Sequence, residues 1–349
     1  MRVGIIAANN IRFSPYIFYY TRILDRIGID YELIYPDRTN VRDNFTANFH
    51  EVAWKKSANV AFSYLDYIKK VKRIVANEKY NLLVVLTMNN AVFMANWLKK
   101  NYTNRYILDV RDYTHENIPI YFSYEKKAVR YSLLNIISSK KFIEFLPKGE
   151  YYTCHNMKKV EKVFSPKLNK NKPITIAYIG TGSYLNNCAK ICEKLCNDTR
   201  FRFVFHGLKN MPDELKDFST ANNIEFHGVF DPSEKEEIIQ NADILFNVYG
   251  NGSPLLDYAL SNKLYDSFVY GKPILTSPGT YMAEMAGPFS FDLDFLTSSF
   301  LDDLFEWYNN LSEDTLSSYA NTKLKEFENE SDQTETKIIE SVTSLGKLI

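Results

Sequence analysis

The chain is poor in cysteine, and it lacks both long hydrophobic runs and a net charge. It contains 4 cysteines among 349 residues, which predicts no disulfide framework and indicates a reducing compartment. No segment approaches the roughly 18 consecutive apolar residues of a membrane-spanning helix. The apolar run at the N-terminus ends at Ala8, too early for a signal peptide. We therefore expect a cytoplasmic protein that is soluble or attached peripherally to a membrane.

Signatures of nucleic-acid binding are absent too. The sequence has no zinc-finger spacing, helix-turn-helix pattern or RNA-recognition motif, so we expect no nucleic acid as a partner. Cys188, Cys192 and Cys196 recur every four residues and would share one stripe of a helix. This stripe fits either a metal or cluster site or a buried face, and the absence of a nearby fourth ligand favours the buried face. No metal or other cofactor is expected.

The neutral total hides two halves of opposite charge. The chain has 42 Lys+Arg and 42 Asp+Glu residues, but residues 1–165 carry a net charge of +11 and residues 166–349 carry −11. A basic half suggests an anionic partner, such as an acidic membrane surface or a phosphate-linked substrate. The alternative is a set of basic side chains that only solvate helix faces.

Strands and helices alternate along both halves. The length exceeds one typical core and suits two domains. The alternation predicts a doubly wound, mostly parallel sheet in each half. The polar, proline-bracketed stretch 163–173 predicts a linker between them. Predicted strands are 3–8, 31–35, 82–86, 106–110, 174–179, 201–205, 224–226 and 244–248. Ser14 and Pro15 predict the start of a helix that ends at Gly28, and further helices are predicted over 58–76 and 91–98. Asp231-Pro232-Ser233-Glu234 predicts the capped start of another helix, and the chain after residue 298 is predicted to be helical.

The segment 261–277 carries the most specific chemistry. It reads as a short helix that begins near Ser261 and ends at Gly271, followed by a buried strand. Lys263 and Asp266 are three residues apart and would project from one face near the helix N-terminus, whose positive end favours anions. A cation and helix amides suit the phosphates of a nucleoside diphosphate, and a carboxylate suits the hydroxyls of its ribose. The alternative is an ordinary amphipathic helix followed by a strand.

Open parallel α/β sheets bind ligands at the carboxyl ends of their strands. In the second half these ends are turns that begin at Gly180, His206, His227 and Tyr249, and the helix after Ser261 follows them. Glycines in the first turn would let backbone amides approach a phosphate, or they would serve only a tight turn. The candidate nucleotide-binding residues are Gly180, Thr181, Gly182, Lys209, Tyr249, Gly252, Ser253, Lys263, Leu264 and Asp266.

Two motifs of the second half extend this interpretation. Asn262-Lys263-Leu264-Tyr265-Asp266 is followed by Gly271-Lys272-Pro273-Ile274, and upstream lies Phe226-His227-Gly228-Val229-Phe230. The first resembles the donor-nucleotide segment of GT-B glycosyltransferases, particularly the family-4-like enzymes of bacterial capsule and exopolysaccharide synthesis. The second resembles their base-binding turn, which adds Val229 and Phe230 to the candidate donor-binding residues. The likeness covers most of the chain, firmly over 226–277 and loosely before residue 165.

The resemblance implies two Rossmann-like domains that face each other across a cleft. They would comprise residues 1–165 on the acceptor side and 166–310 on the donor side, with a helical segment 311–349 that crosses back to the first domain. The implied donor is a nucleoside-diphosphate sugar, and the implied acceptor is a polyprenyl-linked glycan or an oligosaccharide at the inner face of the plasma membrane. Tyr258 departs from the pattern, because many relatives have a glutamate eight positions before the residue that Asp266 matches.

The first half offers candidates for catalysis and for membrane attachment. Asp112 and His115 follow strand 106–110 and could orient or deprotonate an acceptor hydroxyl. The alternative for Asp112 is a pair with Arg111 that only fixes a loop. The cluster of Lys69, Lys70, Lys72 and Arg73 follows the apolar residues Tyr64, Leu65, Tyr67 and Ile68, so this helix suits an acidic bilayer surface, or else the aromatic residues are core.

We therefore expect a GT-B glycosyltransferase that acts in surface polysaccharide synthesis. Two alternatives stay open. A nucleotide-sugar epimerase of the same fold would turn over the donor without any acceptor. A non-catalytic partner would keep the nucleotide pocket without the chemistry, and Tyr258 keeps this alternative open.

Overall fold

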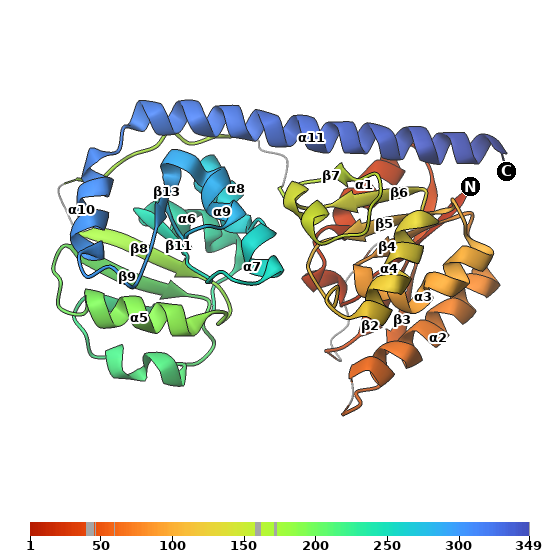
Figure 1. Cartoon of the computed structure of the whole chain (residues 1–349), viewed down its shortest axis with the longest axis horizontal. Helices are drawn as coiled ribbons and strands as arrows, with labels where there is room; N and C mark the ends of the chain where they lie inside the picture. The colour runs from red at the N-terminus through yellow and green to blue at the C-terminus, as the bar shows by residue number, and fades with distance from the viewer. Residues whose placement is uncertain (40–44, 46, 59, 158–161, 171–172, 349) are drawn as a thin grey trace. The chain divides into compact units, whose positions relative to one another are not determined.

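The computed structural model describes residues 1–39, 45, 47–58, 60–157, 162–170 and 173–348. The chain forms two compact units, each with its own sheet (Figure 1). Unit 1 comprises Met1–Asn156 and Asn329–Ile349, and unit 2 comprises Met157–Glu328. The predicted linker 163–173 belongs to unit 2, and its residues 171–172 lie outside the described part of the chain.

Unit 1 contains a seven-stranded sheet in which every pairing is parallel. Its order, β3-β2-β1-β4-β5-β6-β7, reverses direction at β1, as in doubly wound folds. The predicted fold is therefore confirmed, although three short strands of mixed polarity, β3, β6 and β7, were not predicted. The strands are β1 (Arg2–Ile6), β2 (Asp30–Asp37), β3 (Phe49–Ala53), β4 (Leu82–Leu86), β5 (Tyr106–Val110), β6 (Leu134–Ile137) and β7 (Tyr152–Thr153).

The helices of unit 1 agree with the apolar periodicity of the sequence, except that the first helix begins later than predicted. Ser14 and Pro15 were expected to open the first helix, but it begins at Ile17, after a separate 3-10 turn. The Ser14 amide donates to the Ile11 carbonyl at 2.9 Å, so this residue closes the turn instead of capping the helix. The helices are η1 (Ile11–Phe13), α1 (Ile17–Arg26), α2 (Val60–Glu78), α3 (Met88–Asn101), α4 (Pro119–Arg130) and η2 (Lys140–Glu144).

Unit 2 repeats the same architecture with six parallel strands. The order is β10-β9-β8-β11-β12-β13, which again places the reversal of direction at the first strand of the unit. The carboxyl ends of the strands therefore lie at one edge of the sheet, where a ligand site is expected. The strands are β8 (Ile174–Ile179), β9 (Phe201–His206), β10 (Ile224–His227), β11 (Ile244–Asn247), β12 (Ile274–Thr276) and β13 (Ser290–Asp292).

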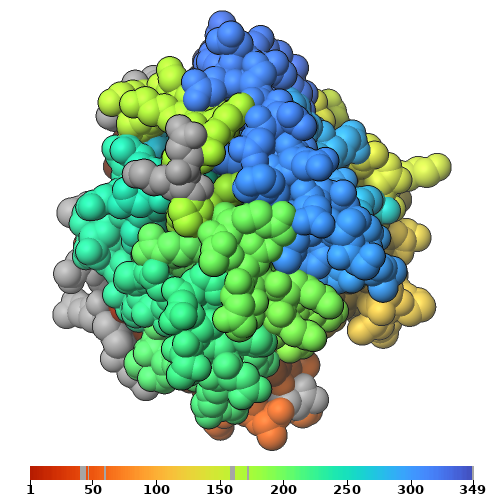
Figure 2. Space-filling view, turned by 90° about the vertical axis from the view of Figure 1, so that its left-hand side faces the viewer, coloured from red at the N-terminus to blue at the C-terminus, as the bar shows by residue number. Residues whose placement is uncertain are grey.

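Two local signals in unit 2 act as the sequence predicts. Asp231 and Glu234 form a reciprocal capping box around Pro232. Gly271, with a φ of +62°, follows the last turn of α8 and ends it. In Figure 2, α5 (green) and α10 (blue) lie on one face of the unit. The helices are α5 (Leu185–Leu195), η3 (Asp213–Phe218), η4 (Pro232–Glu234), α6 (Lys235–Asn241), α7 (Pro254–Tyr258), α8 (Asn262–Val269), α9 (Tyr281–Ala286), η5 (Gly287–Phe289) and α10 (Phe300–Asn310).

The cysteine stripe of α5 belongs to the core of unit 2. Cys188 and Cys192 are fully buried beside Ile191 and Leu195. Burial raises the pKa of Cys188 to about 12, so its thiol stays protonated at neutral pH. The buried-face interpretation therefore holds for these two residues.

The last helix, α11 (Glu313–Leu348), contributes to both units. Its first half places Leu316, Leu324 and Phe327 in a hydrophobic cluster of unit 2. In unit 1, the Thr334 hydroxyl donates to the Thr153 carbonyl at 2.6 Å, and Glu330 accepts from His155 at 3.0 Å. No helix in the described ranges is long and apolar enough to span a bilayer.

Candidate functional site

The carboxyl ends of β8, β9 and β10 form three turns whose backbones touch. The Gly180 amide donates to the His206 carbonyl, and the Gly207 amide donates to the Gly228 carbonyl, both at 3.0 Å. Gly207 has a φ of +97°, and a Cβ there would lie 2.7 Å from the Gly180 carbonyl oxygen, so a side chain is excluded. The Gly180 amide is thus already paired. The expected contact of this turn with a phosphate stays a prediction that needs other amides.

Lys263 holds its ammonium group against aromatic rings. Its Nζ donates to the Tyr249 hydroxyl at 2.6 Å and lies 6.0 Å from the centre of the Tyr178 ring. The Tyr249 ring stacks on Tyr184, with centroids 4.4 Å apart. Within the described part of the chain, no carboxylate lies within ion-pair distance of this half-buried lysine. Its charge is therefore balanced only by a phenol and ring faces, and it remains available to an anion.

Tyr184 is held in an unusual backbone conformation at this place. Its φ is +60°, a left-handed conformation that a tyrosine rarely adopts. The residue directly precedes α5, and the Tyr178 hydroxyl accepts a hydrogen bond from the Gly182 amide at 3.1 Å in the same turn. Strained residues of this kind concentrate at functional sites. In this conformation the Tyr184 ring stacks on Tyr249, the hydrogen-bond partner of Lys263.

Asp266 lies one turn further along α8 and is paired with a cation that the sequence did not indicate. The Lys235 ammonium lies 2.8 Å from its Oδ1 and 2.7 Å from its Oδ2. The helix begins as predicted, because the Ser261 hydroxyl accepts from the Lys263 amide at 3.3 Å. Leu264 is fully buried in the hydrophobic core, so its side chain cannot reach a ligand.

The loop after β11 is pinned by three internal hydrogen bonds. The Gly250 amide donates to the Ser277 hydroxyl at 2.8 Å, and the Asn251 amide group donates to the Pro278 carbonyl at 2.8 Å. The Gly252 amide donates to the Asp257 carboxylate at 2.8 Å. Asp257 directly precedes Tyr258, and it fixes the loop that carries Gly252 and Ser253.

Aromatic rings line the turns after β9 and β10. The rings of His206 and His227 are stacked with centroids 4.8 Å apart, and Phe230 meets His206 edge-on at 6.4 Å. Burial is the main cause of a lowered pKa at His206, and the neighbouring His227 lowers it further, so this imidazole is neutral at neutral pH. Val229 is 71% exposed, and Lys209 is exposed on the loop after β9.

In unit 1, Arg111 is buried in a network at the end of β5. Its Nε lies 2.6 Å from Asp109 Oδ1, and its Nη1 donates to the Cys154 carbonyl at 3.1 Å. The Tyr20 hydroxyl also donates to Asp109, at 2.6 Å. The alternative in which Asp112 pairs with Arg111 is therefore wrong, because Arg111 pairs with Asp109. Side chains alternate along a strand, so residues 109 and 111 share a face and residue 112 does not.

Asp112 and His115 themselves are exposed on the loop that follows β5. Desolvation raises the pKa of Asp112, and the Arg111 guanidinium opposes this to a smaller degree. The carboxylate still reaches solvent, so water retains part of its hydration. The His115 ring meets Tyr121 edge-on at 5.5 Å. Both candidates are thus accessible, as a residue acting on an acceptor hydroxyl must be.

A buried carboxyl group lies behind this loop. Glu125, in α4, is fully buried, and neither of its carboxyl oxygens has a hydrogen-bond partner among the residues that the structure describes. Desolvation, reinforced by the Glu116 carboxylate, raises its pKa to about 9. Glu125 is therefore protonated at neutral pH and bears no charge.

One group with possible metal ligands lies at the opposite end of the unit 1 sheet. Glu32, His50 and Glu78 bring their ligand atoms within 4.8 Å of one another. Arg2 contacts both carboxylates, and the His50 ring pairs with Glu32 at 3.2 Å. These ion pairs account for the cluster, so it carries no functional assignment.

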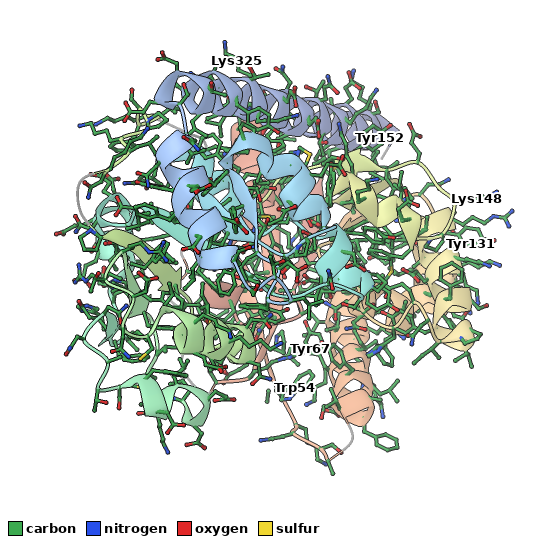
Figure 3. The ribbon with its side chains drawn as sticks, turned by 60° about the vertical axis from the view of Figure 1, so that its left-hand side comes forward. Trp54, Tyr67, Tyr131, Lys148, Tyr152 and Lys325 are labelled. Carbon is green, nitrogen blue, oxygen red and sulfur yellow. The ribbon has the colours of Figure 1, made fainter. Side chains whose placement is uncertain are left out.

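Several residues of the predicted membrane face on α2 are buried or already have partners in the structure. Tyr67 is fully buried beside Trp54, with ring centroids 6.1 Å apart (Figure 3), so this aromatic residue is core. Lys70 pairs with Asp66 at 2.7 Å, and Lys72 donates to the Phe93 carbonyl at 3.3 Å. The exposed residues of α2 include Val60, Phe62, Leu65, Lys69 and Arg73.

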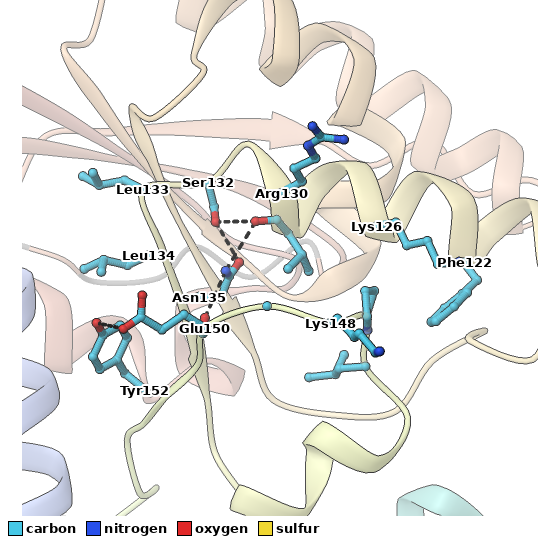
Figure 4. Close-up of a pocket in the computed structure, with 14 residues that line it drawn as sticks. Phe122, Lys126, Arg130, Ser132, Leu133, Leu134, Asn135, Lys148, Glu150 and Tyr152 are labelled. Atoms are coloured by element: carbon cyan, nitrogen blue, oxygen red, sulfur yellow. Dashed lines mark hydrogen bonds between the residues drawn. The ribbon is translucent and has the colours of Figure 1, made fainter.

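A hollow of about 760 Å³ lies elsewhere in unit 1 (Figure 4). It is bounded by α4 and by the segment that leads into β7, and none of the predicted site residues lines it. Sequence reasoning missed this hollow, as well as Lys235, because each depends on residues that only the tertiary fold brings together. The stacking of Tyr184 on Tyr249 could not be predicted, because the sequence indicated only a turn after β8.

Comparisons with known proteins define the fold. No family model matches the sequence, and neither does any curated protein. Sucrose-phosphate synthase from Thermosynechococcus elongatus has a TM-score of 0.72 at 10% identity, covering 99% of this chain and 100% of that chain. Anabaena HepE, in complex with UDP and glucose, gives 0.66 at 11%, covering 99% and 100%. The lipopolysaccharide outer core galactosyltransferase WaaB gives 0.65 at 11%, covering 96% and 100%.

These likenesses place the chain in the GT-B fold, with two domains of parallel strands and alternating helices. At such low identity they show the fold alone, because one fold supports many functions.

Proposed function

We propose that the protein is a glycosyltransferase that transfers a sugar from a nucleoside-diphosphate sugar to a hydroxyl group of a glycan. The observation that carries this proposal is the Lys263 ammonium, half-buried in the first turn of α8. It has a phenol as its hydrogen-bond partner and no carboxylate in the described ranges. A diphosphate would supply the missing counter-charge. The GT-B fold, shared with solved glycosyltransferases, supports the proposal.

In this proposal unit 2 binds the donor. Lys263, at the positive N-terminal end of α8, holds the diphosphate, and Asp266 accepts hydrogen bonds from the ribose hydroxyls while Lys235 orients it. The exposed rings of the turns after β9 and β10 supply a surface for the base. The remaining candidates at the turns, Gly180, Thr181, Gly182, Lys209, Gly252 and Ser253, are kept as predictions.

The chemistry then follows from positioning. The bond between the sugar anomeric carbon and the diphosphate oxygen breaks, and a bond forms between that carbon and the acceptor oxygen. The hydroxyl proton passes to a base in unit 1, for which Asp112 and His115 are the candidates. Negative charge develops on the departing diphosphate, where Lys263 stabilises it. This scheme invokes no metal, because the ammonium group and the positive end of α8 offset that charge.

The basic unit 1 would face the acceptor, which we propose is linked to a lipid at an anionic membrane surface. Exposed Lys69 and Arg73, with Phe62 and Leu65 on the same helix, support such an attachment. Binding of the full chain to acidic vesicles should fall with added salt, since exposed charges are screened within about 8 Å at physiological ionic strength. Co-sedimentation with neutral and acidic vesicles tests this. Equal binding to both would reject an electrostatic attachment.

Incubation with a panel of nucleotide sugars tests the proposal directly. One donor should raise the thermal unfolding temperature and be hydrolysed slowly, and it should be consumed faster when a glycan acceptor is added. Metal chelation should leave this activity intact. Conversion of the donor to an epimer without any acceptor would instead identify an epimerase. Binding without turnover would identify a non-catalytic nucleotide-sugar protein.

A further inference from the structure

We propose that the hollow in unit 1 binds a single anionic amphiphile, a phosphate head group joined to a hydrocarbon chain. The hollow has a volume of about 760 Å³, within the range of about 300–1,000 Å³ that small-ligand pockets usually have. Its lining comes from residues 122–130 of α4, from residues 132–135 at the start of β6, and from residues 146–152, which lead into β7 (Figure 4). The inference does not rest on the proposed donor site.

The hollow is distinct from the candidate catalytic residues. Leu134 and Tyr152, which line it, are the first residues of β6 and β7. It therefore lies at the amino ends of these parallel strands. Asp112 and His115 follow the carboxyl end of β5, at the opposite edge of the same sheet. A ligand in the hollow would accordingly not occupy the place of the reacting hydroxyl.

Three cations border the hollow without ion-pair partners. Lys126 and Arg130 are one helical turn apart on α4, and Lys148 comes from the opposite segment (Figure 4). The Arg130 guanidinium points away from Lys148 and lies 5.7 Å from the centre of the Tyr131 ring, so Lys126 and Lys148 are the cations nearest to the opening. In the described part of the chain, none of the three pairs with a carboxylate, and the Lys126 ammonium lies 4.7 Å over the Phe122 ring. The acidic lining residue, Glu150, accepts a hydrogen bond from the Tyr152 hydroxyl at 2.6 Å. The rim therefore favours a negatively charged group.

The floor of the hollow is apolar. Val129, Leu134 and Leu146 line it and are buried, with exposures of 4%, 8% and 7%. The buried polar group nearby, Asn135, is already satisfied. Its amide donates to the Glu150 carbonyl at 3.3 Å, and its Oδ1 accepts from the Ser132 hydroxyl at 2.8 Å.

The floor thus demands no polar partner from a ligand. A free phosphate ion would leave the apolar floor exposed to water, and an uncharged hydrocarbon chain would make no ionic contact with the basic residues of the hollow. An amphiphile with a phosphate head satisfies both parts, because its head can receive charge-assisted hydrogen bonds while its chain covers the apolar floor.

Decyl phosphate below its micelle concentration is the probe for this site. Calorimetric titration of the full chain should show saturable binding at one site. The triple variant Lys126→Ala, Arg130→Ala and Lys148→Ala should weaken it by about tenfold or more, since each charge-assisted hydrogen bond is among the strong ones. The matched variant Lys55→Ala, Lys56→Ala and Lys100→Ala removes three exposed bases of the same unit outside the hollow and should bind as the parent does.

Inorganic phosphate and decyl maltoside separate the head group from the chain, and both should bind much more weakly than decyl phosphate. Phe122→Ala should weaken decyl phosphate without changing the response to inorganic phosphate. Equal losses in the two triple variants, or binding of either half-probe as tight as decyl phosphate, would overturn the proposal, as would the absence of saturable binding. Circular dichroism and retained nucleoside-diphosphate binding show that each variant is folded, and the latter also keeps this test separate from that of the donor site.

Discussion

Each unit places a cation at the carboxyl edge of its parallel sheet, but the two cations have opposite surroundings. Arg111 in unit 1 is buried and contacts the Asp109 carboxylate and a backbone carbonyl. Lys263 in unit 2 is half-buried and hydrogen-bonds a phenol. A cation whose donors are already filled stabilises the fold, whereas one without an anion is free to bind a ligand. The partners of the two cations, and not their positions at the sheet edge, therefore distinguish the structural Arg111 from Lys263, for which we propose a functional role.

Removing the carboxylate from the unit 1 pair should produce the largest effect. Asp109→Ala leaves the Arg111 charge buried and unpaired, so we expect a loss of about 3–5 kcal/mol in the free energy of unfolding. Urea denaturation measures this loss. Asp112→Ala, on the exposed loop, is the control and should change stability little. Similar values for the two variants would mean that the buried pair does not hold the end of β5.

Removing the unit 2 cation should affect ligand binding more than folding. Lys263→Ala should weaken the binding of a nucleoside diphosphate by about 1.5–3 kcal/mol, the usual value of a hydrogen bond to a charged group. Calorimetric titration with the diphosphate and with the bare nucleoside gives the comparison. Equal losses for both ligands would show that the lysine is structural, like Arg111.

Glu125 sharpens the contrast, because it is a buried carboxyl group without a hydrogen-bond partner in the described part of the chain. Its pKa in the folded chain, about 9, is above the ordinary value of 4.5, so the native state holds a proton that the unfolded state releases. Its contribution to stability is complete below the ordinary pKa and is lost as pH rises towards the folded pKa. Glu125→Gln should therefore gain more than about 1 kcal/mol over the parent at high pH.

Denaturation curves of the parent and Glu125→Gln at about pH 5 and about pH 8 test this. The difference between the two proteins should grow with pH. A constant difference would indicate that Glu125 ionises normally and has a partner in solution.

Tyr249→Phe should have the smallest effect. It removes the hydroxyl that holds the Lys263 ammonium and keeps the ring that stacks on Tyr184. We expect a loss of about 0.5–1.5 kcal/mol in stability and nearly unchanged affinity for the diphosphate. A loss of affinity as large as that of Lys263→Ala would mean that the Tyr249 hydroxyl itself binds the ligand.

The sequence predicted the elements whose signals are local. Apolar runs indicated β1, β2, β4 and β5, and the capping residues around α8 located that helix within one residue. Short strands such as β7, with two residues, contain too few side chains to show a period. They form only because a neighbouring strand is already in place.

The same limit applies to the candidate site. Lys263 could be predicted because it lies near a helix N-terminus that the sequence alone indicates. Its neighbour Asp266 was found as well, but its partner Lys235 lies 31 positions away and is brought there by the packing of α6. The alternative that pairs Arg111 with Asp112 could have been excluded from the sequence, since the alternation of a strand puts Asp109 on the same side as Arg111.

Because α11 closes unit 1 with residues 329–348, the order of synthesis differs from the order of completion. The sheet of unit 1 leaves the ribosome first, yet Tyr19 and His155 meet their α11 partners, Ser331 and Glu330, only after all of unit 2 has been translated. Unit 2 is continuous and can fold as soon as it emerges, since domains generally fold as units during synthesis. The first part of the chain to be made is therefore the last to be finished.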